Sequence, residues 1–256
     1  MKRCVRCATV VALVALAIQP LVFCDVLDGL IGYWSFDEGE GKVAGDVIGG
    51  HDGTVEGADW TDNAIKGTAL KFVPQDDTKV RVEDDKDLDE LPDGLTVANW
   101  IRPLSRGAMM DKSGRADRIQ WFLMEDGRLH WGAGPNFTFS DGPVVEFGEW
   151  SHVVWSHDPI DESVAYVNGE EVHSQKGLGK FVPTGEPMYF GDMGVLPGNN
   201  PKQQNFEGII DEIGFWNRPL SANEVAEVYD KGIDQILAVS ARKKLAMTWA
   251  AVKTRN

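Results

Sequence analysis

Short runs of alternating apolar and polar residues recur from Leu30 to Trp216, and clusters of Gly, Asp and Asn separate them. Alternation with a period of two predicts β-strands that bury one face. The runs with this pattern are 30–36, 69–72, 79–82, 95–101, 119–124, 128–131, 150–155, 163–167, 170–173, 188–190 and 206–216. Asn168 and Gly169 lie between two of these runs and are typical of a tight hairpin, because both turn residues need a positive φ. Many short strands at this spacing predict an all-β sandwich or barrel.

The pattern becomes helical near the C-terminus. Ser221 and Glu224 have the spacing of a capping box, an apolar stripe follows them, and Gly232 ends the segment. One short helix is therefore predicted there. Beyond Asp234 the chain has no acidic residue, and its basic residues are Arg242, Lys243, Lys244, Lys253 and Arg255. Apolar residues recur there at helical spacing. Residues 234–256 are thus predicted to be a basic helical tail, separate from a domain that covers residues 25–233.

The first 24 residues have the pattern of a secretory signal peptide. Three basic residues precede an uncharged run, which extends from Cys7 to Cys24, and small residues precede Asp25. Removal of residues 1–24 predicts a secreted protein, extracellular or periplasmic, with no membrane span in the mature chain. Two alternatives are an uncleaved anchor, since the run reaches the lower limit of a spanning helix, and a lipoprotein modified at Cys24. Phe23 is larger than the residue that usually precedes a lipidated cysteine.

Removal of the leader would also change the cysteine content and the charge of the chain. All three cysteines lie in the leader, so the mature protein would have no disulfide and would depend on its core or on a bound ion. Without the three basic residues of the leader, 22 basic residues face 40 acidic ones, a net charge of −18. This charge argues against a nucleic-acid partner. Residues 83–93, which are mostly acidic, are predicted to form a solvated loop.

Several motifs occur in an order that resembles one known family. They are Leu30-Ile-Gly-Tyr-Trp-Ser-Phe-Asp-Glu-Gly-Glu-Gly41, Asp46, His51-Asp-Gly-Thr54, Ala69-Leu-Lys-Phe72, Leu95 to Pro103, Trp150-Ser-His-Val153, Tyr166-Val-Asn-Gly169, Phe206-Glu-Gly-Ile-Ile-Asp-Glu-Ile213 and Trp216-Asn-Arg-Pro-Leu-Ser221. Together they resemble the laminin-G-like domains of the concanavalin-A-like lectin and glucanase group over about residues 28–232. The resemblance implies an all-β, two-sheet antiparallel jelly-roll sandwich.

The resemblance also implies a structural calcium ion. Its ligands would be Asp46, the backbone of the loop that includes Gly49 and His51, and Asp211 in the last strand motif. Calcium binds six to eight oxygen atoms, which a Gly-rich turn can supply through its carbonyl groups. The loop after Asp46 is one residue shorter than the family pattern. In the alternative interpretation, Asp46 closes a turn and Asp211 bonds neighbouring backbone.

The chain carries no recognisable catalytic motif, and we predict that it is not an enzyme. The β-glucanases that share this sandwich carry Glu-x-Asp-x-x-Glu on one strand, which places a nucleophile and a general acid in the cleft. That spacing does not occur here, nor do the sequence motifs of serine hydrolases, zinc proteases or phosphate-binding loops. His152 and His157, five residues apart in one predicted strand, would face opposite sides of the sheet.

The aromatic residues favour a binding function. Trp121, His130 and Trp131 lie in two strands of one predicted hairpin, where exposed indole rings could stack on sugar rings; the two indoles could equally be buried in the core. The sequence therefore predicts a secreted, non-catalytic binding or adhesion module for carbohydrate or a cell-surface ligand. One alternative is a structural or protein-interaction domain, and another is a diverged glycan-processing enzyme. The sequence does not specify the oligomeric state.

Overall fold

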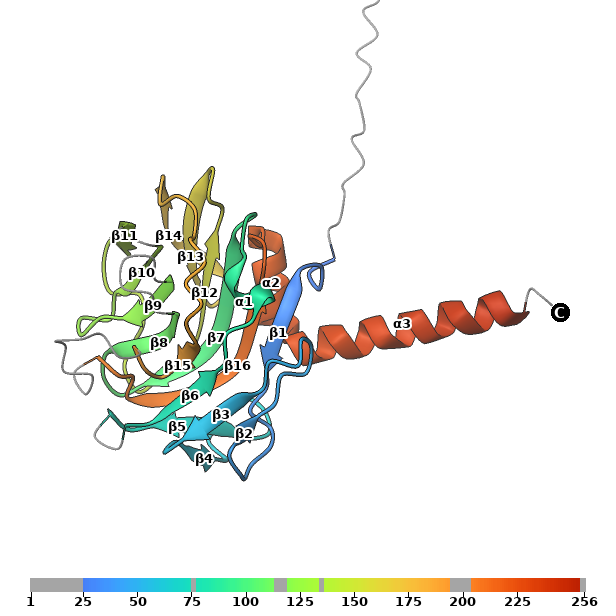
Figure 1. Ribbon diagram of the computed structural model, residues 1–256, viewed down its shortest axis with the longest axis horizontal. Helices are drawn as coiled ribbons and strands as arrows, with labels where there is room; N and C mark the ends of the chain where they lie inside the picture. Colours follow the sequence, from blue (N-terminus) through green and yellow to red (C-terminus); the bar gives the residue numbers. More distant parts are fainter. Residues whose placement is uncertain (1–24, 75–76, 113–118, 134–135, 194–203, 254–256) are drawn as a thin grey trace, which may run out of the picture.

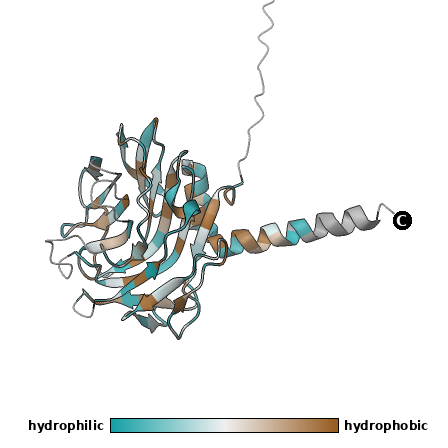
Figure 2. Ribbon diagram, viewed as in Figure 1, coloured by the Kyte–Doolittle hydropathy of each residue, from teal (hydrophilic) through white to brown (hydrophobic). Residues whose placement is uncertain are grey.

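The computed structural model describes residues 25–74, 77–112, 119–133, 136–193 and 204–253. Over these residues the chain forms two antiparallel β-sheets that pack face to face (Figure 1). The predicted all-β sandwich is confirmed. Apolar and polar residues are interspersed along its strands (Figure 2), although every residue is buried in β8 (Gly107–Lys112), β9 (Ile119–Leu123), β12 (Ser151–His157) and β16 (Gly208–Trp216). The predicted leader, residues 1–24, lies outside the described residues.

The first sheet contains the strands β1 (Leu30–Trp34), β4 (Asp59–Thr61), β5 (Ala69–Phe72), β7 (Leu95–Pro103), β12 (Ser151–His157), β13 (Glu162–Val167), β14 (Glu170–Lys176) and β16 (Gly208–Trp216). Their order is β14-β13-β12-β7-β16-β5-β4, and β1 also pairs with β16. The first strand of the domain therefore pairs with its last strand.

The second sheet contains β2 (Val43–Ala44), β3 (Gly53–Glu56), β6 (Lys79–Val82), β8 (Gly107–Lys112), β9 (Ile119–Leu123), β10 (Leu129–Ala133), β11 (Asn136–Phe139) and β15 (Met188–Phe190). Their order is β11-β10-β9-β8-β15-β6-β3-β2. The described strands of this sheet join segments from both halves of the chain, since β15 lies between β6 and β8.

Each predicted run contains a strand, and the predicted hairpin is confirmed. Asn168 and Gly169 have φ values of 52° and 82° and connect β13 to β14. The sequence interpretation missed β2, β3, β4, β8 and β11. The sequence of β8, Gly-Ala-Met-Met-Asp-Lys, does not alternate between apolar and polar residues, and its charged Asp111 and Lys112 are both buried.

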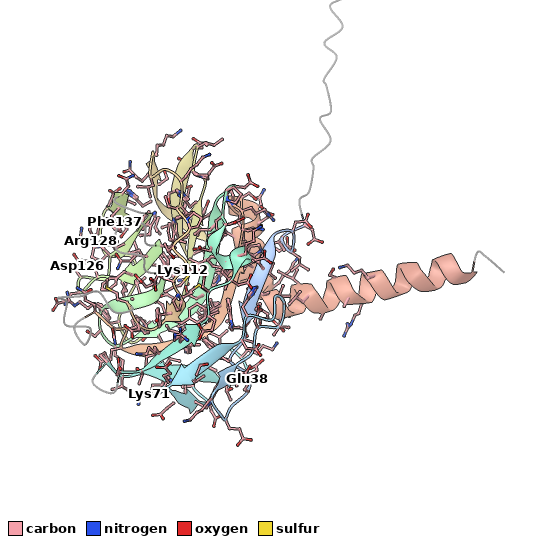
Figure 3. All side chains as sticks on the ribbon, in the orientation of Figure 1. Glu38, Lys71, Lys112, Asp126, Arg128 and Phe137 are labelled. Atoms are coloured by element: carbon pink, nitrogen blue, oxygen red, sulfur yellow. The ribbon has the colours of Figure 1, made fainter. Side chains whose placement is uncertain are left out.

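The acidic segment 83–93 is more ordered than a solvated loop, and that prediction is partly wrong. It contains the short helix α1 (Lys86–Asp89), which buries Leu88 against the core. The Nζ atom of Lys112 lies 2.5 Å from Asp84 and 3.3 Å from Asp89, and this lysine is 1% exposed. Figure 3 shows Lys112 within the sandwich. Its ion pairs fasten the acidic segment to β8, since a buried ammonium group requires partners.

The predicted C-terminal helix is confirmed as α2 (Ala222–Lys231). Ser221 and Glu224 form both halves of the capping box. Val225 and Val228 pack on the outer face of the first sheet, in a cluster with residues of β7, β12 and β13. This helix therefore covers one outer face of the sandwich.

The last helix, α3 (Ile233–Lys253), extends away from the sandwich (Figure 1). Its first turn belongs to the packed domain, because Ile233 and Ile236 are buried in the same cluster as α2. The predicted boundary at residue 233 thus falls inside a helix. None of the helices in the described chain has the length and apolar character needed to cross a membrane.

Candidate functional site

A pocket of about 270 Å³ opens on the outer face of the second sheet. Its lining residues are Arg106, Gln120, Phe122, Met124, His130, Met193 and Gln204. Alternation along β9 explains the lining: Trp121 and Leu123 point into the core, so Gln120 and Phe122 point outward. No helix of the described chain covers this face, whereas α2 packs on the outer face of the first sheet.

The pocket combines an apolar floor with polar side chains. Phe122 and Met193 are buried in a small cluster with Ala108, and Met124 packs against it. The polar side chains come from β9, from β10 and from the loops that flank β8 and follow β15. Although the chain has 40 acidic residues, none of the described residues that line this pocket is acidic. Apolar walls with a few polar groups are typical of small-molecule sites.

An aromatic cluster extends from the pocket towards the edge of the sheet. The ring of His130 lies 6.2 Å from Phe122, 5.2 Å from Phe137 and 4.4 Å from Phe139. Phe139 is 38% exposed, and the guanidinium carbon of Arg128 lies 5.3 Å from the centre of its ring. Phe137 and Arg128 lie at the same end of the molecule in Figure 3. The cluster therefore offers an accessible ring next to a pocket.

The prediction that Trp121 and Trp131 form a stacking platform is wrong, because both are fully buried between the sheets. Their rings pack edge to face at 6.2 Å, and their indole N–H groups donate to Asn99 and Ser163. His130, the third predicted ligand residue, does line the outer pocket. Neighbouring residues of a strand face opposite sides, so His130 and Trp131 could not share one site. The same rule applied to Trp121 indicates Phe122 on the ligand side.

The predicted metal residue Asp46 is occupied by hydrogen bonds. Its carboxylate accepts the backbone N–H groups of Tyr33, Ile48, Gly49 and His51 at 2.8–3.0 Å, and the Nδ1 atom of His51 at 3.0 Å. Burial alone would raise the pKa of Asp46, but these hydrogen bonds outweigh burial and hold the pKa below its ordinary value. Asp46 is thus a charged group that closes the loop between β2 and β3.

Asp211, predicted to share the same ion, belongs to a different network. Its Oδ2 atom accepts the backbone N–H groups of Ile65 and Lys66 at 2.8 and 3.4 Å. Its Oδ1 atom is buried and has no partner among the described residues. Next to it, Glu212 accepts the hydroxyl of Tyr33. Burial raises the pKa of Asp211 to about 8 and that of Glu212 to about 7, so Asp211 is mostly neutral near pH 7.

Residues 74–226 match the family model of the concanavalin A-like lectin/glucanase superfamily, laminin-G type. The chain belongs to this superfamily. The resemblance of the motifs is therefore confirmed, and the match covers more than half of the chain. A search of curated proteins finds no match in sequence.

Several solved structures share the superfamily fold with this chain. The binding domain of Paraclostridial Mosquitocidal Protein 1 is 16% identical, with a TM-score of 0.63 over 80% of this chain and 52% of that one. Domain 4 of AbnA, a GH43 extracellular arabinanase from Geobacillus stearothermophilus in complex with arabinotriose, is 20% identical, with a TM-score of 0.60 over 78% and 98%. The botulinum neurotoxin serotype G binding domain is 16% identical, with a TM-score of 0.60 over 78% and 50%. The chain spans about half the length of these toxin domains.

The calcium ion that the superfamily resemblance implies does not fit the arrangement of Asp46. A carboxylate that accepts five hydrogen bonds has no oxygen lone pair left for a cation. The carbonyl oxygen of His51 also has a partner, since it accepts the indole N–H of Trp34 at 3.0 Å. The contacts agree with the alternative interpretation, in which Asp46 closes a turn and Asp211 bonds backbone. Calcium at this place stays a prediction.

The histidines of β12 do not form a site. His152 packs against Trp100 and Tyr229 on the α2 side of the first sheet, with ring centres 5.1 and 5.8 Å away. His157 lies on the core side, against Phe181. The prediction that they face opposite sides is therefore confirmed.

Proposed function

We propose that the protein is a non-catalytic carbohydrate-binding module that acts outside the cytoplasm. The observation that carries this proposal is the outer pocket of the second sheet together with the exposed ring of Phe139. Sugars present apolar CH faces and hydroxyl groups, so aromatic rings and amide or guanidinium groups bind them together. Gln120, Arg106 and Gln204 would supply the hydrogen bonds, and Phe139 would supply a stacking surface.

The superfamily and the solved structures support a binding role. One structural neighbour, Domain 4 of AbnA, was solved with arabinotriose, and it is a separate domain of an enzyme. The absence of acidic residues from the described pocket lining supports a non-catalytic role, because glycoside hydrolysis commonly uses a pair of carboxylates. The N-terminal signal pattern supports export. Intact mass of exported protein would test export, with a mature chain that begins at Asp25 expected.

A second candidate is a module that binds another protein. The burial of Trp121 and Trp131 favours it, because the two largest aromatic residues predicted for sugar stacking are unavailable. The aromatic cluster around His130 would then contact apolar side chains of a partner. The two candidates differ in the ligand that the same face would bind.

A glycan array followed by calorimetry tests the first candidate. We expect binding to at least one glycan class, and we expect Arg106→Ala and Phe139→Ala each to weaken it about tenfold, equivalent to about 1.4 kcal/mol. Phe147→Ala is the matched control, because Phe147 has a similar exposure of 36% but lies outside the pocket. No glycan binding, or equal losses in all three variants, would refute the carbohydrate proposal.

A further inference from the structure

The side chain of His51 is held in one orientation by a buried carboxylate. Its Nδ1 atom lies 3.0 Å from Oδ2 of Asp46, whose side chain is 0% exposed. The Asp46 carboxylate accepts four backbone N–H groups and lies against Nδ1, so Nδ1 is the hydrogen donor in this contact. In the neutral imidazole, Nε2 is then the unprotonated nitrogen and carries a lone pair. A carboxylate that orients histidine in this way is typical of metal-binding histidines.

The free nitrogen of His51 points at two carboxylates. Nε2 lies 3.8 Å from Oδ1 of Asp85, and ligand atoms of His51, Asp85 and Asp87 all lie within 4.8 Å of one another. The His51 side chain is only 10% exposed, and Nε2 has no hydrogen bond among the described residues. No Lys or Arg of the described residues forms an ion pair with Asp85 or Asp87. Oδ1 of Asp85 also accepts the backbone N–H of Asp87 at 3.0 Å as the N-cap of α1, which leaves this oxygen a lone pair for a cation. Three electron-pair donors therefore converge without a Lys or Arg side chain between them.

We propose that His51, Asp85 and Asp87 bind a divalent transition-metal ion, most favourably zinc. Imidazole and carboxylate are the nitrogen and oxygen ligands that zinc takes, at about 2.0–2.2 Å. Two ligands at those distances stand roughly 3.3–3.5 Å apart, close to the 3.8 Å between Nε2 and Oδ1. The N-cap hydrogen bond orients the Asp85 carboxylate, the exposed Asp87 side chain can rotate towards the ion, and water completes the tetrahedron.

The site differs in position and chemistry from the predicted calcium site. It uses the ring nitrogen of His51 instead of its backbone carbonyl, and it uses Asp46 to orient the histidine. A nitrogen ligand favours zinc over calcium, which prefers oxygen ligands. The ion would join the loop between β2 and β3 to the start of α1, so zinc binding would stabilise the folded chain.

Zinc titration by calorimetry tests the proposal, with cobalt absorption as an independent reading of tetrahedral coordination. The full chain is used without an affinity tag and with Cys4→Ser, Cys7→Ser and Cys24→Ser, because leader thiols would themselves bind zinc. We expect one ion per chain, a higher melting temperature with zinc, and no comparable effect of calcium. Asp87→Asn should weaken zinc binding at least tenfold, and His51→Gln should weaken it further.

Asp93→Asn is the matched control, because Asp93 lies in the same acidic segment, is exposed, and is no part of the cluster. Asp87 is itself exposed, so Asp87→Asn tests the site even if His51→Gln fails to fold. No zinc binding, or equal binding in Asp87→Asn and Asp93→Asn, would overturn the proposal. A melting temperature that calcium raises as much as zinc would also overturn it.

Discussion

Replacement of Asp211 by Asn should stabilise the protein at neutral pH. Asp211 is 0% exposed, and burial raises its pKa from 3.8 to about 8. Between these two values the folded chain holds a proton on Asp211 that the unfolded chain has released. Stability from this residue therefore falls as pH rises from 3.8 to 8 and is constant above that window. A side-chain amide at position 211 does not ionise between pH 3.8 and pH 8, so the variant does not lose this stability.

The magnitude follows from the size of the pKa change. At pH 7, which is about 3 pH units above the unfolded pKa, the loss reaches about 4 kcal/mol at 1.36 kcal/mol per unit. Relaxation of the chain and entry of water reduce it, and we expect a gain of about 1–3 kcal/mol for Asp211→Asn. The amide oxygen can keep the hydrogen bonds from Ile65 and Lys66. For a domain of this size, the gain raises Tm by roughly 2–12 °C.

Denaturant unfolding at pH 4.5 and pH 7.5 in a calcium chelator measures this effect. The difference between Asp211→Asn and wild type should be small at pH 4.5 and large at pH 7.5. Asp62→Asn, an exposed acid with no ion pair among the described residues, is the control and should change neither value. Equal destabilisation by Asp211→Asn at both pH values would refute the reasoning. A wild-type Tm that rises with calcium, and does so only while Asp211 is present, would instead support the calcium ion implied by the superfamily.

The remaining predictions concern acid stability and the C-terminal tail. Burial lowers the pKa of His152 to about 3, so the unfolded chain alone takes up this proton as pH falls from 6.5 towards 3, and stability is lost. At pH 5 the loss in the free energy of unfolding is about 2 kcal/mol. His152→Phe should remove this loss. If denaturant unfolding of the variant still shows the wild-type decrease in stability between pH 7.5 and pH 5, the prediction is contradicted. Deletion of residues 239–256 should leave Tm within about 2 °C of wild type, because the described apolar packing of α3 on the sandwich ends near Leu237. Deletion of residues 235–256 also removes Ile236, so it should lower stability by about 2 kcal/mol while the domain stays folded. If the deletion of residues 239–256 unfolds the protein, as seen by circular dichroism, more of α3 belongs to the core.

Local sequence patterns were sufficient to predict most of the secondary structure. Asn168 and Gly169 predicted their hairpin because a two-residue turn depends only on the φ angles of those residues. Ser221 and Glu224 predicted the start of α2 because a capping box satisfies backbone groups within one turn. The order of the motifs was sufficient to identify the superfamily. β8 escaped prediction, since its buried Asp111 and Lys112 acquire their environment only from neighbouring strands and from Asp84 and Asp89.

The functional site depended on tertiary structure. Alternation shows that Trp121 and Phe122 face opposite sides of β9, but it does not show which side is the core. That choice follows from the first sheet, which covers Trp121, whereas Phe122 lies on the opposite face of β9 and lines the outer pocket. The pocket also needs Arg106, Met193 and Gln204, which the fold brings to β9 from distant parts of the chain. By itself the sequence determined the strands, the turns and the superfamily, because these depend on local geometry and motif order. Only the packing of the two sheets decided which aromatic residues remain accessible, because burial is a property of the whole assembled chain.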